Sequence, residues 1–179
     1  LEPVADFAAS FEAQINIVST IDYNIGSGIG KTVKESQPDL IIFDWPARHG
    51  FIDRMINDTA KSIVGCTSKT TMICQFALPL ALHRRIVVIC APMAEKEKGF
   101  EQWLQKISRL SHELSIPLLI HCDRKSRLAI DETLKTKPSS APVLYKPYKS
   151  FREWENLSKR RPQFREDDII AFVSARRES

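Results

Sequence analysis

The glycine-rich segment 26–32, GSGIGKT, is the first stretch whose residue types suggest chemistry. In a phosphate-binding loop, backbone N–H groups wrap the phosphates and a lysine neutralises their charge. That loop needs a glycine five positions before the glycine of Gly-Lys-Thr, and this chain has Ile25 there. Asp44, after the apolar residues 40–43, would supply a carboxylate for magnesium. A phosphotransferase using Lys31 and Asp44 is therefore a lesser alternative to a glycine-rich turn that leads into a helix.

The chain carries four cysteines: Cys66, Cys74, Cys90 and Cys122. They form no CxxC pair, and cysteines beside apolar runs behave as small hydrophobic residues of a reducing, cytosolic compartment. A nucleophilic thiol needs a histidine or a helix N-terminus to lower its pKa. Cys90 is the best placed, because it precedes the loop of Ala91 and Pro92, but its apolar neighbours favour packing. We expect no catalytic residue, and we treat Cys90, Ala91 and Pro92 as candidate ligand-binding positions.

A metal site is not expected either. His121, Cys122 and Asp123 are three potential ligands in a row. Successive side chains of a strand point to opposite faces, so these three cannot all reach one ion.

The composition, with 43% hydrophobic and 27% charged residues, is that of an ordinary globular protein. The formal net charge of +4 is mild and the basic residues are scattered, so nucleic acid is not an expected partner. No apolar run approaches the ~20 residues that a membrane-spanning helix needs. The chain begins at Leu1, which suggests a fragment or a processed product of a longer polypeptide.

Apolar periodicity predicts alternating strands and helices. The centre of the prediction is a βαβ unit: a strand at 86–90, a helix at 100–114 whose apolar residues lie three and four apart, and a strand at 116–121. Further strands are expected at residues 15–23, 40–43, 70–77, 142–145 and 169–173. Further helices are expected at residues 3–11, 29–36, 51–64, 126–134 and 151–157.

One pattern occurs twice, as DLIIF at 39–43 and as DIIAF at 168–172. The two copies lie roughly 130 residues apart, which is the size of one small α/β domain. We therefore expect two lobes, residues 1–80 and residues 81–179. The first would lack its opening strand and helix, and the second its closing helix and strand. A parent polypeptide that is longer at both ends explains this shifted frame most simply.

An ordered set of residues carries a resemblance to a known family. The set comprises Asp22, Asn24, Ile25, Gly28, Ile29, 32–35, 39–42, Asp53, Arg54, 78–80, 84–88, Ala94, Glu95, Glu97, Gly99, Phe100 and Trp103. The frame-shifted α/β pattern resembles paired universal stress protein domains. More closely, it resembles the cytosolic C-terminal region of Bacteroidetes-type cation:proton (sodium/hydrogen) antiporters. The resemblance covers residues 15–120 well and the remainder loosely.

The resemblance implies an α/β fold with mainly parallel sheets, helices on both faces and two universal-stress-protein-like (adenine nucleotide alpha hydrolase-like) lobes. It implies a non-catalytic regulatory or assembly domain at the cytoplasmic face of the inner (plasma) membrane, with no cofactor, that acts by self-association or small-ligand sensing. The implied partners are the transmembrane antiporter domain of the same polypeptide and a second copy. The edge at 70–77 is the candidate dimer surface. Antiport itself would belong to the transmembrane part, because an intramembrane ionisable site needs a membrane span.

Stress-protein domains that hold ATP typically carry Gly-x-x-Gly, nine residues and Gly-Ser/Thr after the fourth strand. In the first lobe that spacing falls on Asp44, Ala47, Asn57 and Asp58. Carboxylates at these positions would repel a triphosphate. In the second lobe the matching loop bears Arg176 and Arg177, which could attract an anion. A module for an adenine nucleotide or a cyclic dinucleotide therefore stays open as the alternative function, although its glycines are missing.

Overall fold

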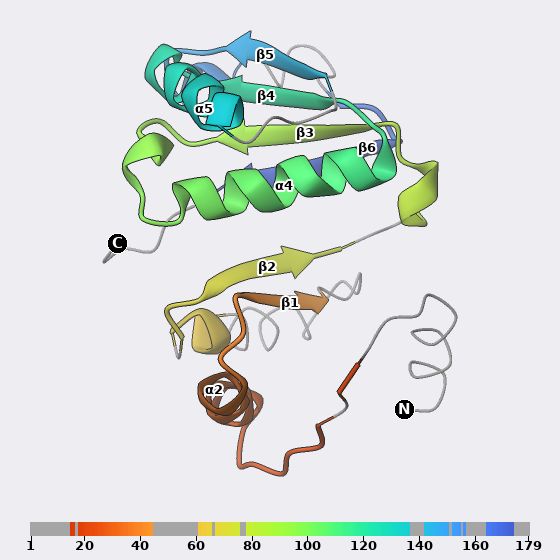
Figure 1. The fold of residues 1–179 in the computed structure, drawn as a ribbon, viewed down its shortest axis with the longest axis vertical. Helices are drawn as coiled ribbons and strands as arrows, with labels where there is room; N and C mark the ends of the chain where they lie inside the picture. The colour runs from red at the N-terminus through yellow and green to blue at the C-terminus, as the bar shows by residue number, and fades with distance from the viewer. Residues whose placement is uncertain are drawn as a thin grey trace. The chain divides into compact units, whose positions relative to one another are not determined.

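The computed structural model describes residues 15–16, 18–44, 61–65, 67–75, 78–136, 142–150, 152–154, 156 and 164–173. These residues belong to two units, Leu1–Gln75 and Phe76–Ser179. Each unit contains a parallel sheet, and Figure 1 shows both together with their helices. The chain is therefore an α/β protein. The boundary expected after residue 80 falls in the segment between the last strand of unit 1 and the first strand of unit 2.

Unit 1 contains helix α2 (Ile25–Ser36) and a two-stranded sheet of β1 (Leu40–Asp44) and β2 (Thr70–Cys74). The two strands run parallel and in register, with Leu40 beside Thr70. Residues 61–65, which precede β2, are also helical. The β1 strand begins one residue after the first copy of the repeated pattern does, so the pattern marks a strand as expected.

Helix α2 owes its start and its position to two small residues. The Asn24 Oδ1 atom accepts the backbone N–H of Ser27 at 2.7 Å, which is the usual way to satisfy a free donor at a helix start. A Cβ atom on Gly26 would lie 2.0 Å from the Oγ atom of Ser62. Only glycine therefore fits where α2 meets the helical segment 61–65.

Unit 2 contains a sheet of four parallel strands in the order β5-β4-β3-β6. The strands are β3 (Arg85–Cys90), β4 (Leu118–Cys122), β5 (Val143–Pro147) and β6 (Asp168–Val173). Short 3-10 turns at Leu80–Leu82 and Ala94–Lys96 precede and follow β3. The chain leaves β3 toward β4 and β5, and β6 then returns to the other side of β3. Doubly wound α/β sheets bind ligands beside such a reversal of strand order, outside the carboxyl ends of the strands.

The two faces of this sheet are covered differently. Helices α4 (Phe100–Leu114) and α5 (Arg124–Thr136) lie on one face, where they bury the apolar stripe predicted from the sequence. The core residues on this face are Ile86, Val88, Cys90, Phe100, Trp103, Leu104, Ile107, Leu118, Ile120, Cys122 and Ile130. The other face carries a smaller cluster of Ile89, Tyr148 and Trp154, with Phe164 packed against it. Residues 152–154 and 156 are helical, in the segment predicted to form a helix at 151–157.

In unit 2 each predicted strand is a strand and each predicted helix contains helical residues, and the bounds of the strands differ from the prediction by at most two residues.

Two predictions for unit 1 are wrong. Residues 15–16 and 18–23 form no strand, and Ile15, Val18 and Ile21 expose 45%, 57% and 100% of their surface, so no face of them is buried. The glycine-rich segment, expected to be a turn before a helix at 29–36, is itself helical from Ile25 onward, because the Asn24 cap starts the helix and the glycines allow close packing. The predicted helix at 3–11 and most of that at 51–64 lie outside the described residues.

No helix within the described ranges has the length and hydrophobicity that a membrane crossing requires.

Candidate functional site

Two cysteines end neighbouring strands at the carboxyl edge of the unit 2 sheet. Cys90 ends β3 and Cys122 ends β4, and they are 0% and 1% exposed. Burial raises the pKa of the Cys90 thiol to about 12, and the neighbouring Cys122, Asp123 and Glu95 act in the same direction. Burial and Asp123 likewise raise the pKa of the Cys122 thiol to about 12. Both groups are protonated at neutral pH, so neither offers a thiolate for covalent catalysis.

Tyr148, which follows β5, lies across the carboxyl ends of β4 and β3. Its backbone N–H donates to the carbonyl oxygen of Cys122 at 3.2 Å, and its hydroxyl donates to the carbonyl oxygen of Cys90. The residue is 4% exposed, and burial raises the pKa of its phenol, so the hydroxyl stays a donor. The backbone of Tyr148 is therefore bonded to the end of β4 and its side chain to the end of β3, which is one of the two strands beside the reversal of strand order where such sheets hold their ligands.

His121 and Trp154 pair on the face of the sheet opposite α4 and α5. The Trp154 Nε1–H group donates to the Nδ1 atom of His121 at 3.1 Å, and the two rings meet edge-on with centroids 6.3 Å apart. The proton of the neutral imidazole therefore sits on Nε2, which is buried and has no hydrogen-bond partner among the residues that are described. Burial, together with the nearby cations Lys146 and Arg85, lowers the pKa of His121 to about 4. At neutral pH this histidine is uncharged and fixed in orientation.

The loop that follows β3 contains the predicted positions Ala91 and Pro92. Ala91 is half-buried and Pro92 is exposed. The next residue, Met93, adopts a left-handed backbone with φ of 65° and exposes 57% of its surface. Among the candidate ligand-binding residues at this strand end, Cys90 thus points into the core, and Ala91 and Pro92 reach solvent.

A hydrogen-bond network ties this loop to the first turn of α5. The Ser126 hydroxyl donates to Glu95 Oε2 at 2.7 Å, and Ser126 is 0% exposed. Asp123 Oδ1 accepts the backbone N–H groups of Lys125 at 2.7 Å and of Ser126 at 3.0 Å. The carboxylate of Asp123 therefore already accepts the free backbone N–H groups at the start of α5, which could otherwise bind a phosphate.

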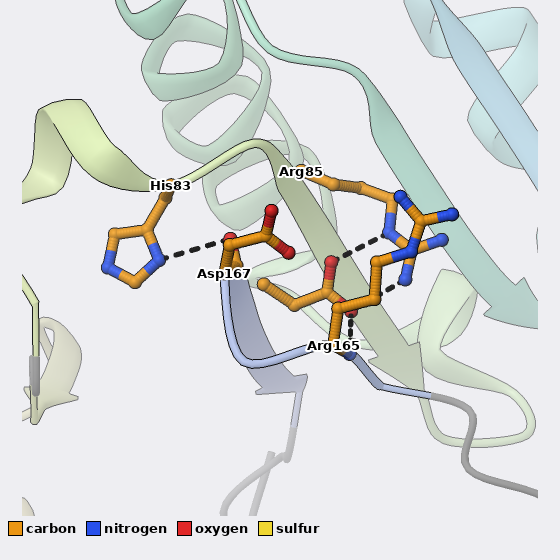
Figure 2. A network of polar contacts seen from close by, with 5 residues as sticks. His83, Arg85, Arg165 and Asp167 are labelled. Atoms are coloured by element: carbon orange, nitrogen blue, oxygen red, sulfur yellow. Dashed lines mark hydrogen bonds and ion pairs between the residues drawn. The ribbon is translucent and has the colours of Figure 1, made fainter.

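The opposite edge of the sheet holds a second polar network, shown in Figure 2. Asp168 Oδ1 and Oδ2 accept from Arg85 Nε at 2.8 Å and Nη2 at 2.6 Å, and the backbone N–H of Arg165 donates to Oδ2 at 2.8 Å. Burial alone would raise the pKa of the Asp168 carboxyl, but the bonds from Arg85 and Arg165 hold it below its usual value. The pKa of Arg85 is raised, chiefly by its bond to Asp168.

This second network links the segments that enter β3 and β6. His83 Nδ1 lies 3.3 Å from the backbone oxygen of Asp167, which also accepts the N–H of Arg84 at 3.0 Å. The network lies at the amino ends of the strands, opposite the edge where parallel sheets bind ligands. We interpret it as a clamp between β3 and β6. Its one signal in the sequence is a charged residue at the first position of each strand, Arg85 in β3 and Asp168 in β6, and this signal does not show that the two residues pair.

The glycine-rich segment of unit 1 does not form a loop around a possible phosphate. The backbone N–H of Gly28 donates to the carbonyl of Asn24 at 3.1 Å, and the Thr32 hydroxyl donates to the carbonyl of Gly28 at 3.0 Å. These groups serve the helix α2, and Lys31 is exposed on it. The arrangement counts against the phosphotransferase alternative, because a phosphate-binding loop precedes its helix.

The remaining predicted positions are mostly not placed. Asp44 is the last residue of β1. Ala47, Asn57, Asp58, Arg176 and Arg177 lie outside the described residues. Within the described ranges no three metal-binding side chains converge on a possible ion site.

A comparison with known protein families, curated proteins and solved structures finds no match. The class of this protein therefore rests on its fold, which is an α/β fold with parallel sheets and helices.

Proposed function

We propose that this chain is a non-catalytic regulatory or assembly domain of a membrane cation:proton antiporter, acting at the cytoplasmic face of the inner membrane. The resemblance of the ordered residues between 15 and 120 is the basis for the antiporter assignment. The parallel α/β fold supports it, because it agrees with the fold that the resemblance implies. The transmembrane antiporter domain of the same polypeptide would be its partner, and two universal-stress-protein-like lobes would form it.

The observation that carries the choice of mechanism is the position of Tyr148. Its hydroxyl is bonded to the Cys90 carbonyl at the carboxyl end of β3, one of the two strands beside the reversal of strand order where such sheets bind ligands. The protonated thiols of Cys90 and Cys122 and the uncharged, hydrogen-bonded His121 give a reaction no ready nucleophile or base. These features count against a nucleotide at this edge and against catalysis by these groups, and self-association is the mechanism that we propose in their place.

Self-association is tested by sedimentation velocity of the 179-residue chain from about 1 µM to about 200 µM, because the population of a dimer rises with concentration. We expect a dimer that gains population across this range. A monomer at every concentration would contradict the assembly mechanism.

The alternative, a nucleotide-binding module, is favoured by the strand order alone. A thermal-shift screen with ATP, ADP, AMP, cyclic AMP and cyclic di-AMP separates the two, because a ligand that binds only the native state raises the melting temperature. We expect no shift with the wild-type chain. A concentration-dependent rise would identify a nucleotide sensor instead.

A further inference from the structure

We propose that Met93 is the site in unit 2 at which a peroxide modifies this protein, by oxidation to methionine sulfoxide. The proposal goes beyond the proposed function and does not depend on it. Unit 2 contains three sulfur-bearing side chains, those of Cys90, Met93 and Cys122. Cys90 ends β3 and precedes Met93 by three residues, and Cys122 ends the neighbouring strand β4.

Among these three residues only Met93 is exposed to solvent. It exposes 57% of its surface, whereas Cys90 and Cys122 expose 0% and 1%. Burial also raises the pKa of both thiols to about 12, so they stay protonated at neutral pH. Oxidation of cysteine starts from the thiolate, and the oxidation of sulfur in proteins follows its exposure. In the folded chain a peroxide therefore meets Met93 as the one reactive sulfur of unit 2.

The exposure of Met93 belongs to an ordered loop. The backbone N–H of Lys96 donates to the carbonyl of Met93 at 3.0 Å. Ala94, the next residue, is buried and belongs to the apolar core of unit 2. Glu95 then accepts the hydroxyl of the buried Ser126 at 2.7 Å. The residues that follow Met93 thus fix the loop to the core, while Met93 itself stays at the surface.

The reaction transfers one oxygen atom and two electrons. The thioether sulfur of Met93 attacks one oxygen of hydrogen peroxide, so that an S–O bond forms and the O–O bond breaks. The attacked oxygen passes its proton to the departing hydroxide, which leaves as water. Sulfur is oxidised, the peroxide is reduced, and the product is the sulfoxide, which methionine sulfoxide reductases convert back to the thioether.

Oxidation at Met93 should leave the fold intact. A sulfoxide is polar, and it disrupts a protein when the methionine packs in a core or an apolar interface. Met93 is exposed, so its sulfoxide remains in water and the melting temperature should not change. Met72 in β2 is half-buried and serves as the comparison within the same chain.

Peptide mapping of the full chain after treatment with hydrogen peroxide tests the proposal. Trypsin releases residues 86–96 as one peptide that contains Cys90 and Met93, and fragment spectra show which of the two carries added oxygen. In the native chain Met93 should gain one oxygen several-fold faster than Met72, while Cys90 and Cys122 stay reduced.

Unfolding should reverse this order. In about 6 M urea the pKa of the two thiols returns to about 8.5, so at about pH 7.5 their thiolate fraction rises about 3,000-fold. Cys90 and Cys122 should then be oxidised before Met93.

The variant Met93→Leu keeps an apolar side chain without sulfur, so its native peptide 86–96 should take up no oxygen. Met72→Leu is the matched control and should leave the uptake at Met93 unchanged. Methionine sulfoxide reductases should remove the oxygen from the native chain, because the modified residue is exposed. Oxidation of Cys90 or Cys122 before Met93 in the native chain would overturn the proposal. Equal rates at Met93 and Met72, or uptake by peptide 86–96 of native Met93→Leu, would overturn it as well.

Discussion

The buried pair of His121 and Trp154 makes the stability of this protein depend on pH. Protonation of His121 would place a second donor on Nδ1, where the Trp154 N–H already points at 3.1 Å, and would charge a side chain that is 2% exposed. The folded protein therefore binds this proton only near pH 4, whereas the unfolded chain binds it near pH 6.5. Between these values the unfolded state holds more protons, so the free energy of unfolding falls as the pH falls.

The magnitude follows from the difference between the two pKa values. The complete loss is about 3 kcal/mol, of which about 2.5 kcal/mol is reached at pH 4.5. Above about pH 6.5 the contribution of His121 is fully present, and below about pH 4 it is gone. The carboxyl of Asp168 has a pKa below its usual value, so it titrates at lower pH than this window.

The assay is urea unfolding of the wild type and of two variants, followed by circular dichroism, between about pH 7 and about pH 4.5. His121→Gln cannot titrate, so its stability should lack the loss of about 2.5 kcal/mol between these two pH values. His112→Gln, on the exposed side of α4, should keep the wild-type slope. The reasoning is refuted if His121→Gln and the wild type lose stability equally.

Three further substitutions test packing and polar contacts. Asp168→Asn breaks the pair with Arg85, and urea unfolding should show a loss of about 3 kcal/mol, because a buried charge loses its partner; a loss below about 1 kcal/mol would contradict the clamp. Gly26→Ala should destabilise by about 1–3 kcal/mol in the same assay, because a Cβ would meet Ser62, although alanine is the better helix former; a gain in stability would show that the two helical segments separate easily. Tyr148→Phe should cost about 1 kcal/mol by removing one donor, and an unchanged melting curve would argue against the bond to the strand end.

The strands and helices of unit 2 could be predicted because each is encoded by the residues of its own segment. The apolar run of β3 predicts a strand, and the spacing of three and four residues between the apolar positions of α4 predicts a helix, whatever the rest of the chain does. In unit 1 the same rules failed at residues 15–23. A segment rich in β-branched residues predicts a strand. A strand also needs a neighbouring strand to pair with, and the segment's own sequence does not show whether that neighbour exists.

The polar contacts of the candidate site could not be predicted in the same way. The Tyr148 hydroxyl and the Cys90 carbonyl are 58 residues apart in the chain, and Arg85 and Asp168 are 83 apart. Such pairs meet only after the strand order is fixed, and a single sequence does not fix the order. The repeated pattern at 39–43 and 168–172 predicted strands at both places, yet the role of Asp168 as the partner of Arg85 depends on β6 lying beside β3.

The central claim, that this chain is part of an antiporter at the membrane, is tested most directly by antibodies raised against it. The source cells are fractionated, the membranes are washed with alkaline carbonate, and each fraction is blotted. The account predicts a band well above the 20.4 kDa of this chain that stays in the washed membranes. A band at 20.4 kDa in the soluble fraction alone would contradict it.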